Sequence, residues 1–410
     1  MSLREHELTA LDPTADPAQE ARLLRTSGCP MAAVELPGGV PAWAAVTHEA
    51  VKDVLGHEDL SKDPRDWAAR RDGLIPEDWP LGALVDGGDF LHQTGEEHAR
   101  KRRLVAGAFK RAPIAALTPR IREFADELLE ALPNDGGPVD IKEHYAYRLA
   151  IRVICEVLGV PESAATDLRT HFESLVRPKG EAAFAEALGA IAGTFAQVVE
   201  HKQLHPGDDL TTRLIEARDN GDQLTQEEVQ RIVFLLVIAG HETTVNLITS
   251  AVHALLTDPA ALDAARSGQV TWDDVVDETL RHSPPVRYAL MRYATKDITI
   301  GGAAIAAGEP VIAALYAAGR DPNVHEHPDT YDLARSTRRE HLAFGYGAHY
   351  CLGSLLARQE AILALEALFT CFPDLTAAGP AEAFPSIPLY GRDTLPVRLR
   401  AGDRAPEPVA

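Results

Sequence analysis

A single cysteine, Cys351, lies in a glycine-rich segment, Phe344–Gly353, just before an apolar pattern of helical period. Glycine lets a backbone turn tightly and approach a flat partner closely. The start of the following helix offers unpaired N–H groups and a positive dipole end, and both favour a thiolate over a thiol. A thiolate is a soft metal ligand, so the segment indicates a metal site with one sulfur donor.

The number and spacing of the cysteines restrict the kind of metal site. The chain has four cysteines, Cys29, Cys155, Cys351 and Cys371, and none is spaced as Cys-x-x-Cys. A structural zinc or an iron–sulfur cluster needs more ligands than this, whereas haem iron needs a single axial thiolate. The other three cysteines are interpreted as ordinary packing or loop residues, and unpatterned thiols fit a reducing cytoplasm.

A second segment with chemical potential, Ala239–Thr244, lies inside the longest helical pattern, which opens with a Thr225-x-x-Glu228 capping box. Its small residues, Ala239 and Gly240, would let a flat macrocycle lie against the helix. An acid followed by a hydroxyl, Glu242 and Thr243, can hold water and pass protons during cleavage of dioxygen.

Two other interpretations of this segment are available. A threonine in mid-helix often only donates its hydroxyl back to the preceding turn, and Thr243 could do no more than that. The pair His241-Glu242 also begins a zinc-protease motif, but that motif requires a histidine at position 245, where this chain has valine.

The segments Phe344–Gly353 and Ala239–Thr244 resemble the haem-binding loop and the oxygen-activation motif of the cytochromes P450. The resemblance spans nearly the whole chain, and it is strongest to soluble actinobacterial members that hydroxylate macrolides and other secondary metabolites. It implies haem b with Cys351 as the axial ligand, and Glu242 and Thr243 in proton delivery.

The same resemblance assigns further contacts to the haem. Each of these residues alone would pass for an ordinary one, but charge-assisted hydrogen bonds to the two propionate carboxylates need cationic and imidazole side chains. His98 and Arg102 are spaced i, i+4 and so share one helix face. The implied haem-binding residues are His98, Arg102, Arg292, His349, Phe344, Gly345, Gly353, Ala239 and Gly240.

A structural ion-pair network is a third implication. Glu278 and Arg281 are three residues apart on one helix face, and such pairs are usually solvated and worth little. In the family this spacing marks a buried network that a second arginine completes, and Arg335 is the matching residue. Because breaking a buried charge network is costly, its expected role is to hold the thiolate loop.

The resemblance also places a substrate chamber. An apolar lining implies a sizeable, largely hydrophobic substrate, although ordinary core packing is the alternative for each residue. A break in the helical patterns at 177–180 suggests the tip of a lid. The implied lining residues are Leu84, Val85, Phe90, Leu91, Val237, Ile238, Val286, Tyr288, Ala289, Leu290, Ile387 and Leu389.

Electrons must come from another protein, because the chain carries no flavin or nicotinamide fingerprint of its own. A ferredoxin with its ferredoxin reductase is the expected donor. Basic residues near the haem would attract an acidic redox protein, although a solvated helix face is the plainer explanation of such a charge run. The docking candidates are Lys101, Arg103 and Arg358.

Composition excludes several other classes of protein. A net charge of −21 in 410 residues argues against a nucleic-acid binder. The apolar run 232–240 is too short to span a bilayer, and the charged first twenty residues do not resemble a membrane anchor. No linker or repeat divides the chain, so we expect one cytoplasmic, monomeric domain over residues 1–410.

Helical periodicity dominates the elements that must position these residues. The two strongest strand signals are hairpins that turn on glycine pairs, one over 34–46 and one over 298–303. A helix-rich, mainly α cytochrome P450 fold is therefore expected, with a small β part mostly in 30–65 and 295–315. The predicted helices cover 114–132, 147–158, 164–176, 181–202, 225–256, 272–282 and 352–372.

The expected activity is that of a haem-thiolate monooxygenase, which inserts one atom of O2 into a hydrophobic small molecule, as in hydroxylations of antibiotic biosynthesis. Epoxidation, desaturation or C–C coupling by the same cofactor stays open, because the position of the substrate selects among them. A haem-binding sensor would keep Cys351 but would not need Glu242 and Thr243 beside the haem. That pair therefore favours the enzyme.

Overall fold

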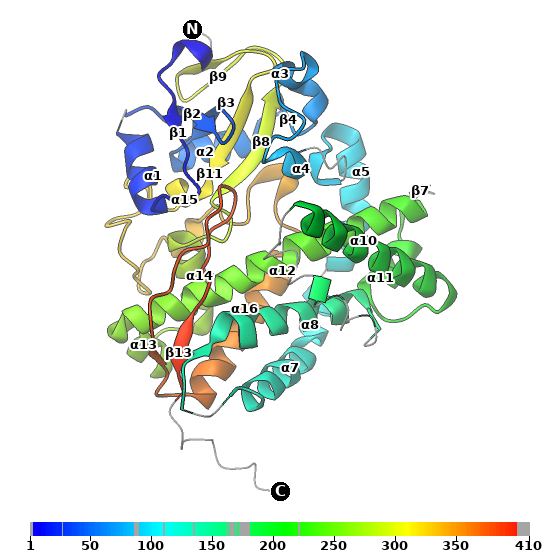
Figure 1. Ribbon diagram of the computed structural model, residues 1–410, viewed down its shortest axis with the longest axis vertical. Helices are drawn as coiled ribbons and strands as arrows, with labels where there is room; N and C mark the ends of the chain where they lie inside the picture. Colours follow the sequence, from blue (N-terminus) through cyan, green and yellow to red (C-terminus); the bar gives the residue numbers. More distant parts are fainter. Residues whose placement is uncertain are drawn as a thin grey trace, which may run out of the picture.

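The computed structural model describes residues 3–26, 28–85, 90–109, 111–133, 136–161, 181–219 and 222–399, together with 164, 168, 170 and 171. Helices form one large part of the molecule, and a sheet with its own short helices forms the other (Figure 1). The helices are α1 Pro17–Arg25, α2 His48–Gly56, α3 Ala68–Arg71, α4 Gly82–Val85, α5 Gly95–Ala106, α6 Arg111–Ala116, α7 Thr118–Glu130, α8 Tyr147–Leu158, α10 Glu181–Leu204, α11 Leu210–Glu216, α12 Gln226–Thr257, α13 Pro259–Arg266, α14 Trp272–His282, α15 Leu315–Ala318 and α16 Ser354–Cys371.

Helix α12 runs through the middle of the helical part (Figure 1). The predicted capping box is present: the Thr225 hydroxyl accepts from the Glu228 N–H at 3.2 Å, and the Glu228 carboxylate accepts from the Thr225 N–H at 2.9 Å. Helices α8, α10, α14 and α16 pack around α12. By length and composition α12 could cross a membrane, but 56% of its most apolar window is buried inside the protein, as in a core helix.

The largest sheet has six strands in the order β1-β2-β3-β11-β8-β4. Its hairpin β2–β3 pairs Met31 with Ala45 and turns at Gly38 and Gly39, whose φ angles of 84° and 75° suit glycine. The second predicted hairpin is β9–β10, which turns at Gly301 and Gly302. The strands are β1 Thr9–Ala10, β2 Met31–Leu36, β3 Val40–Ala45, β4 Leu60–Ser61, β5 Val139–Asp140, β6 Arg218–Asp219, β7 Asp222–Gln223, β8 Tyr288–Ala294, β9 Ile298–Ile300, β10 Ala303–Ile305, β11 Pro310–Ala314, β12 Thr376–Ala377 and β13 Pro396–Arg398.

The β part extends beyond the two predicted ranges. Strand β8 precedes residue 295 and pairs with both β11 and β4, so it lies inside the main sheet. A second sheet, in the order β12-β13-β5, joins the C-terminal segment to a strand before α8. Strands of two or three residues are too short to show an alternating pattern, which is why the sequence did not indicate this sheet.

The C-terminal segment between β12 and β13 lies against α12 (Figure 1). Its chain turns back on itself, with Ala383 bridged to Arg392, and we call residues 382–393 the C-terminal hairpin. At Gly391 the backbone approaches α12 so closely that a Cβ there would lie 2.0 Å from Oδ1 of the buried Asn246. The hairpin is therefore seated on the central helix at a point that requires glycine.

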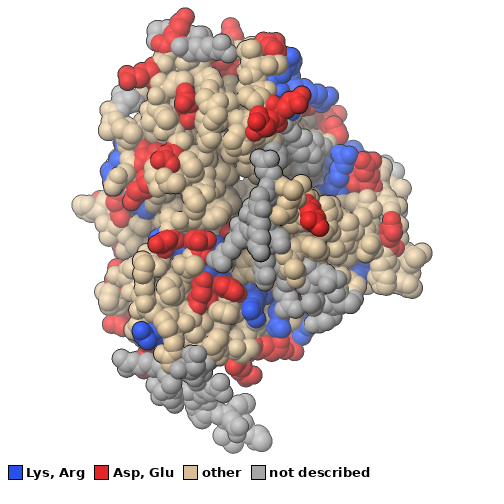
Figure 2. All heavy atoms as spheres, viewed as in Figure 1, with Lys and Arg blue, Asp and Glu red and all other residues tan. Residues whose placement is uncertain are grey.

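Acidic and basic side chains are interspersed over the face in Figure 2, and its described residues form no broad basic patch. This distribution agrees with the net charge of −21. The described part of the chain thus shows, on this face, no surface of the kind that binds nucleic acids.

Replacing Gly391 with alanine should destabilise the protein by about 1–3 kcal/mol, because the hairpin or Asn246 must move to admit the methyl group. The measurement is urea unfolding followed by circular dichroism. Gly189→Ala is the matched control, since Gly189 lies in α10 with open space around it and alanine is the better helix former. Equal midpoints for Gly391→Ala and the wild type would contradict the close packing.

Candidate active site

The thiol of Cys351 follows a sharply turned loop and precedes α16. Gly345 and Gly347 have φ angles of 76° and 73°, and the N–H of Cys351 donates to the carbonyl of Phe344 at 2.9 Å. Burial raises the pKa of the Cys351 thiol, while the N–H groups of Gly353 and Ser354 at the helix start oppose that rise. The Cys351 side chain is nevertheless accessible to solvent.

Four predicted haem-binding side chains converge beside this loop. The rings of His98 and His349 stack with their centroids 4.0 Å apart, and Arg102 donates to the carbonyl of Tyr350 at 2.5 Å. Burial and the positive charges of Lys62, Arg292 and Arg102 lower the pKa of His349 to about 2. The structure therefore gathers His98, Arg102, Arg292 and His349, and it adds Lys62.

Arg292 is the most informative member of this group. It is 3% exposed, and its Nη1 has no hydrogen-bond partner among the described residues. Burial lowers its pKa to about 10. A buried guanidinium is costly unless an anion neutralises it, so the surroundings of Arg292 fit an anionic partner such as a propionate.

Lys62 is a member of this group that the sequence did not predict. It is 7% exposed, and its Nζ donates to the carbonyl of Leu290 at 3.1 Å. Burial first, and then the charges of Arg102 and Lys62, lower the pKa of His98 to about 4. The ring of Phe90 also stacks on His98 at 4.9 Å. A lysine so far from the other cationic residues in sequence gives no local signal of this role.

In α12 the acid and the hydroxyl face different partners. The hydroxyl of Thr243 donates to the carbonyl of Ala239 at 2.7 Å, so it makes the back-bond of a mid-helix threonine and keeps its lone pairs for a further donor. The Glu242 carboxylate lies 3.4 Å from Nζ of Lys142, which is itself buried. Burial raises the pKa of Glu242, although Lys142 acts in the opposite direction.

The small residues before this pair keep one part of α12 open. Ala239 is exposed and Gly240 half-buried, although both lie in the middle of the central helix. His241 instead points into the core, with Nε2 3.4 Å from the carbonyl of Tyr147. Among the described residues no group of three His, Cys, Asp or Glu side chains is placed to hold a metal ion.

The structure brings Glu278, Arg281 and Arg335 together. The Arg281 guanidinium binds both carboxylate oxygens of Glu278 at 2.8 and 2.7 Å, and both side chains are fully buried. Arg335 lies 3.4 Å from the same carboxylate. The remaining donors of Arg281 bind the carbonyls of Gly319 at 2.8 Å, Pro328 at 2.7 Å and Thr330 at 2.9 Å.

Two docking candidates have other partners. Lys101 is 7% exposed and lies 3.1 Å from Glu97 and 3.4 Å from Glu228, so the structure does not support a surface role for it. Arg358 binds Asp273 at 2.6 Å and also pairs with the buried Asp277, which ties α16 to α14. Arg103 is the candidate that the structure leaves exposed.

The proposed chamber residues also divide. Val85, Val237 and Ile387 are 0–3% exposed within packed cores, and Tyr288 donates its hydroxyl to Glu20 at 2.5 Å, so core packing accounts for these four. Leu84 and Leu91 are 49% and 38% exposed. Ile238, Val286, Ala289, Leu290 and Leu389 are half-buried and remain candidates for the lining. The suggested lid at 177–180 lies outside the described residues.

Comparison with known proteins decides the family. A cytochrome P450 family model matches residues 176–375. The chain is 39% identical over 400 residues to a 2-hydroxy-5-methyl-1-naphthoate 7-hydroxylase of Streptomyces carzinostaticus, covering 95% of this chain and 97% of the relative. It belongs to the cytochrome P450 family. It is therefore an oxidoreductase, a haem-thiolate monooxygenase with the fold expected from the sequence.

Two further comparisons describe the branch of cytochromes P450. A mycinamicin IV hydroxylase/epoxidase of Micromonospora griseorubida is 34% identical, covering 91% of this chain and 94% of the relative. The solved structure of CYP154A1 from Streptomyces coelicolor A3(2) superposes with a TM-score of 0.85 at 40% identity, covering 96% of this chain and 100% of that one. This cytochrome P450 is thus similar along nearly its whole length to actinobacterial enzymes.

The donor set of this cytochrome P450 fits a haem. One thiol lies at a helix start, and a group of cationic and imidazole side chains lies beside its loop. One of these, Arg292, is a buried guanidinium with a nitrogen that has no partner among the described residues. A thiolate suits iron, and the cations suit two carboxylates. Residues that the sequence analysis assigned to these two tasks are near one another in the fold.

Replacing Arg281 with alanine should cost about 3–5 kcal/mol of unfolding free energy, because it leaves the buried Glu278 carboxylate without its main partner. The measurement is chemical denaturation of the cytochrome P450 with and without haem. Arg231→Ala removes an exposed i, i+4 partner of Glu227 and should cost about 0.3–0.5 kcal/mol. A loss as small as the control's would mean that the network is not structural.

Proposed function

We propose that this cytochrome P450 hydroxylates a largely apolar small molecule of secondary metabolism. The observation that carries this proposal is the accessible Cys351 thiol in a loop that Arg102 contacts at Tyr350 and whose His349 feels the charge of the buried Arg292. Cys351 would supply the thiolate ligand of a haem iron, and His98, Arg102, Arg292 and His349 would bind its propionates. Haem, when bound, supplies the redox chemistry that activates dioxygen.

The chain's own residues then have three tasks. Phe344, Gly345 and Gly353 shape the loop that presents the thiol, and Ala239 and Gly240 leave room for a flat cofactor beside α12. Glu242 and Thr243 hold and move protons: the carboxyl has a raised pKa and so carries a proton more readily than an exposed glutamate. Glu278, Arg281 and Arg335 hold the approach to the thiolate loop in place.

The substrate class follows from the chamber and the relatives. The half-buried candidates for the lining, Ile238, Val286, Ala289, Leu290 and Leu389, are all apolar, which favours a hydrophobic ligand. One relative is named for hydroxylation of a methylated hydroxynaphthoate, and another for both hydroxylation and epoxidation of a mycinamicin. We propose hydroxylation as the main reaction and epoxidation as the second.

Electrons are proposed to come from a ferredoxin and its reductase, which dock near the thiolate loop. Arg103 is exposed on α5, close in sequence to the Arg102 that touches this loop. Tyr346, Tyr350 and Leu355 are close to Cys351 in sequence and are 42%, 43% and 39% exposed, so they would add apolar area to a docking surface there. We further propose that residues 1–410 act as one cytoplasmic, monomeric domain.

The test of the proposed function is the carbon monoxide difference spectrum of the reduced protein. Thiolate ligation shifts the Soret band strongly to the red, so we expect that band in the wild type and its loss in Cys351→His. Titrating the ferric protein with hydrophobic compounds, including 2-hydroxy-5-methyl-1-naphthoate, should identify ligands that convert low-spin to high-spin iron. A wild-type band typical of histidine ligation would overturn the assignment of Cys351.

Reversing the charge of Arg103 should slow reduction by a ferredoxin several-fold at low salt, because opposite charges speed the encounter. The difference should shrink as salt screens the charges above about 0.5 M, where the Debye length falls to a few ångströms. The measurement is the rate of reduction of Arg103→Glu and of the wild type by a ferredoxin in a stopped-flow instrument. Arg398→Glu, an exposed change on β13 at the far end of the molecule from α5, is the control (Figure 1). Equal rates for both variants would exclude docking at Arg103.

A further inference from the structure

One face of α12 carries polar side chains that the described residues leave unsatisfied. Glu242, Asn246 and Ser250 follow one another at i, i+4 and i+8, so they lie in a row along the helix. Oε2 of Glu242, both amide atoms of Asn246 and Oγ of Ser250 are buried, and among the described residues none of them makes a hydrogen bond of ordinary geometry. The Asn246 amide is nevertheless close enough to Glu242 to lower the pKa of its carboxyl, against the larger effect of burial. Asn246 is 0% exposed and Ser250 is 3% exposed.

Buried polar atoms in native proteins are almost always hydrogen-bonded, to protein or to ordered water. A row of orphaned atoms at helical spacing is therefore best explained by internal water. Asn246 can donate two hydrogen bonds and accept others, so it can join waters on both sides of it. The row of Glu242, Asn246 and Ser250, with the segments packed over it, is here called the polar seam.

The segment that covers the polar seam is the C-terminal hairpin. Gly391 abuts the amide of Asn246, and Arg392 lies 3.2 Å from His253, farther along the same helix. On the other side of Glu242, Nζ of Lys142 lies 3.4 Å from its carboxylate and 5.5 Å from the ring centre of Phe384. The hairpin therefore contacts both Asn246 and the lysine that pairs with Glu242.

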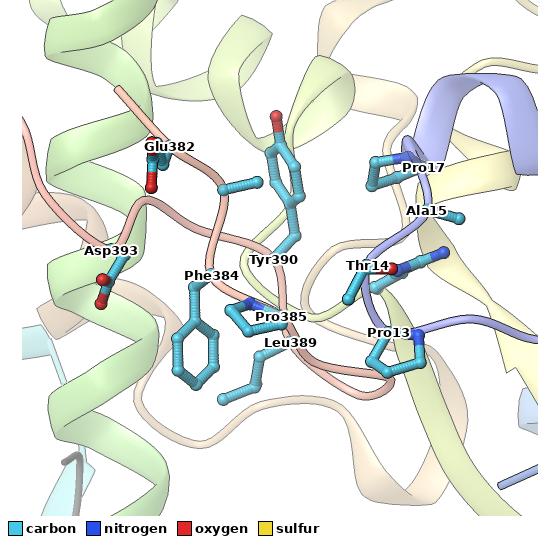
Figure 3. A pocket seen from close by; sticks show the side chains of 12 residues that line it. Pro13, Thr14, Ala15, Pro17, Glu382, Phe384, Pro385, Leu389, Tyr390 and Asp393 are labelled. Atoms are coloured by element: carbon cyan, nitrogen blue, oxygen red, sulfur yellow. The ribbon is translucent and has the colours of Figure 1, made fainter. Parts of the chain in front are cut away.

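A surface pocket opens on the outer side of this hairpin (Figure 3). It has a volume of about 360 Å³ and lies between the hairpin and the N-terminal segment that contains Thr14 and Pro17. Phe384 and Asp393 line it, and Asp393 appears at its edge in Figure 3. The negative charge of Asp393 reaches Glu242, where it adds to the effect of burial on the carboxyl.

We propose that the polar seam is the route by which protons travel from this pocket to Glu242, with Asp393 at its outer end and Lys142 holding the Glu242 carboxylate. The inference rests on the proposed role of Glu242 in proton delivery. Each proton that Glu242 passes on towards Thr243 is replaced through waters at Asn246 from Asp393. Asp393 takes each proton from bulk water and passes it on, so no side chain changes its protonation over a cycle.

Lys142 is a positioning residue in this scheme. Its backbone N–H donates to Asp140 at 3.0 Å, and Asp140 also accepts from the N–H of Leu395 at 2.9 Å. The lysine is therefore tied to the chain just beyond Asp393. Asp140 therefore fixes the position of Lys142 relative to the base of the C-terminal hairpin.

The first test is a crystal structure of the haem-loaded protein at a resolution that shows ordered water. We expect waters bound to both the Asn246 amide and the Ser250 hydroxyl, between α12 and the C-terminal hairpin. A seam closed by direct side-chain contacts, with no water at Asn246, would overturn the proposed route without any reference to activity.

The second test measures the hydrogen peroxide released per NADPH oxidised, with a plant-type ferredoxin and its reductase as electron source and 2-hydroxy-5-methyl-1-naphthoate as probe. Slow proton delivery diverts electrons to peroxide. Asp393→Asn should raise this ratio roughly threefold to tenfold, and Glu242→Gln should raise it at least as much. Glu382→Gln is the matched control, because it removes the same charge from the same pocket and should leave the ratio unchanged.

The outcomes separate the route from the function on which it rests. If Glu242→Gln raises the ratio and Asp393→Asn matches the wild type, the route through the pocket is wrong and the role of Glu242 stands. If Glu242→Gln also matches the wild type, the role of Glu242 in proton delivery and the route through the pocket are both wrong. Asn246→Leu should behave like Asp393→Asn. Should it fail to fold beside Gly391, the Asp393 variant and the crystal structure still decide the question.

Discussion

The bidentate pair of Glu278 and Arg281 anchors the stretch of chain that leads to the loop of Cys351. Its two side chains are fully buried, and Arg281 spends its other donors on the carbonyls of Gly319, Pro328 and Thr330. The stretch between α15 and the thiolate loop has little regular structure, so these bonds replace the ladder that a helix or strand would provide. The loop that presents Cys351 follows directly from this stretch.

Local patterns allowed much of the fold to be predicted. The capping box at Thr225, the two glycine-pair hairpins and the long helices before and after the thiol all have short-range causes, and all are present. The proposed roles of Cys351 and of the Glu242–Thr243 pair likewise rest on neighbouring residues in the sequence, and they stay predictions. Roles that depend on contacts between distant parts of the chain could not be predicted. Lys62 and Lys142 become informative only when the fold buries them beside His98 and Glu242.

Several residues predicted to lie in the site or on the docking surface are buried or paired elsewhere, and one physical reason explains why the sequence does not show this. The sequence shows that Lys101 is charged and that Tyr288 is aromatic. It does not show that Lys101 lies beside Glu228 or that Tyr288 lies beside Glu20. Val237 and Ile387 are apolar, and an apolar side chain serves a packed core as well as a chamber. The position of a residue on a helix limits which neighbours it can contact, but its burial in the fold decides whether it packs in the core or lines a chamber.

The two stretches of the polypeptide that border the proposed chamber are joined by backbone hydrogen bonds. Val286 is bridged to Leu389, the N–H of Arg287 donates to the carbonyl of Pro388 at 2.8 Å, and the N–H of Tyr390 donates to Pro285 at 2.9 Å. Residues about a hundred positions apart in sequence thus share one wall. A shift of one stretch would therefore displace the other, so exchanging the proposed lining with that of a relative calls for transplanting both stretches as a pair.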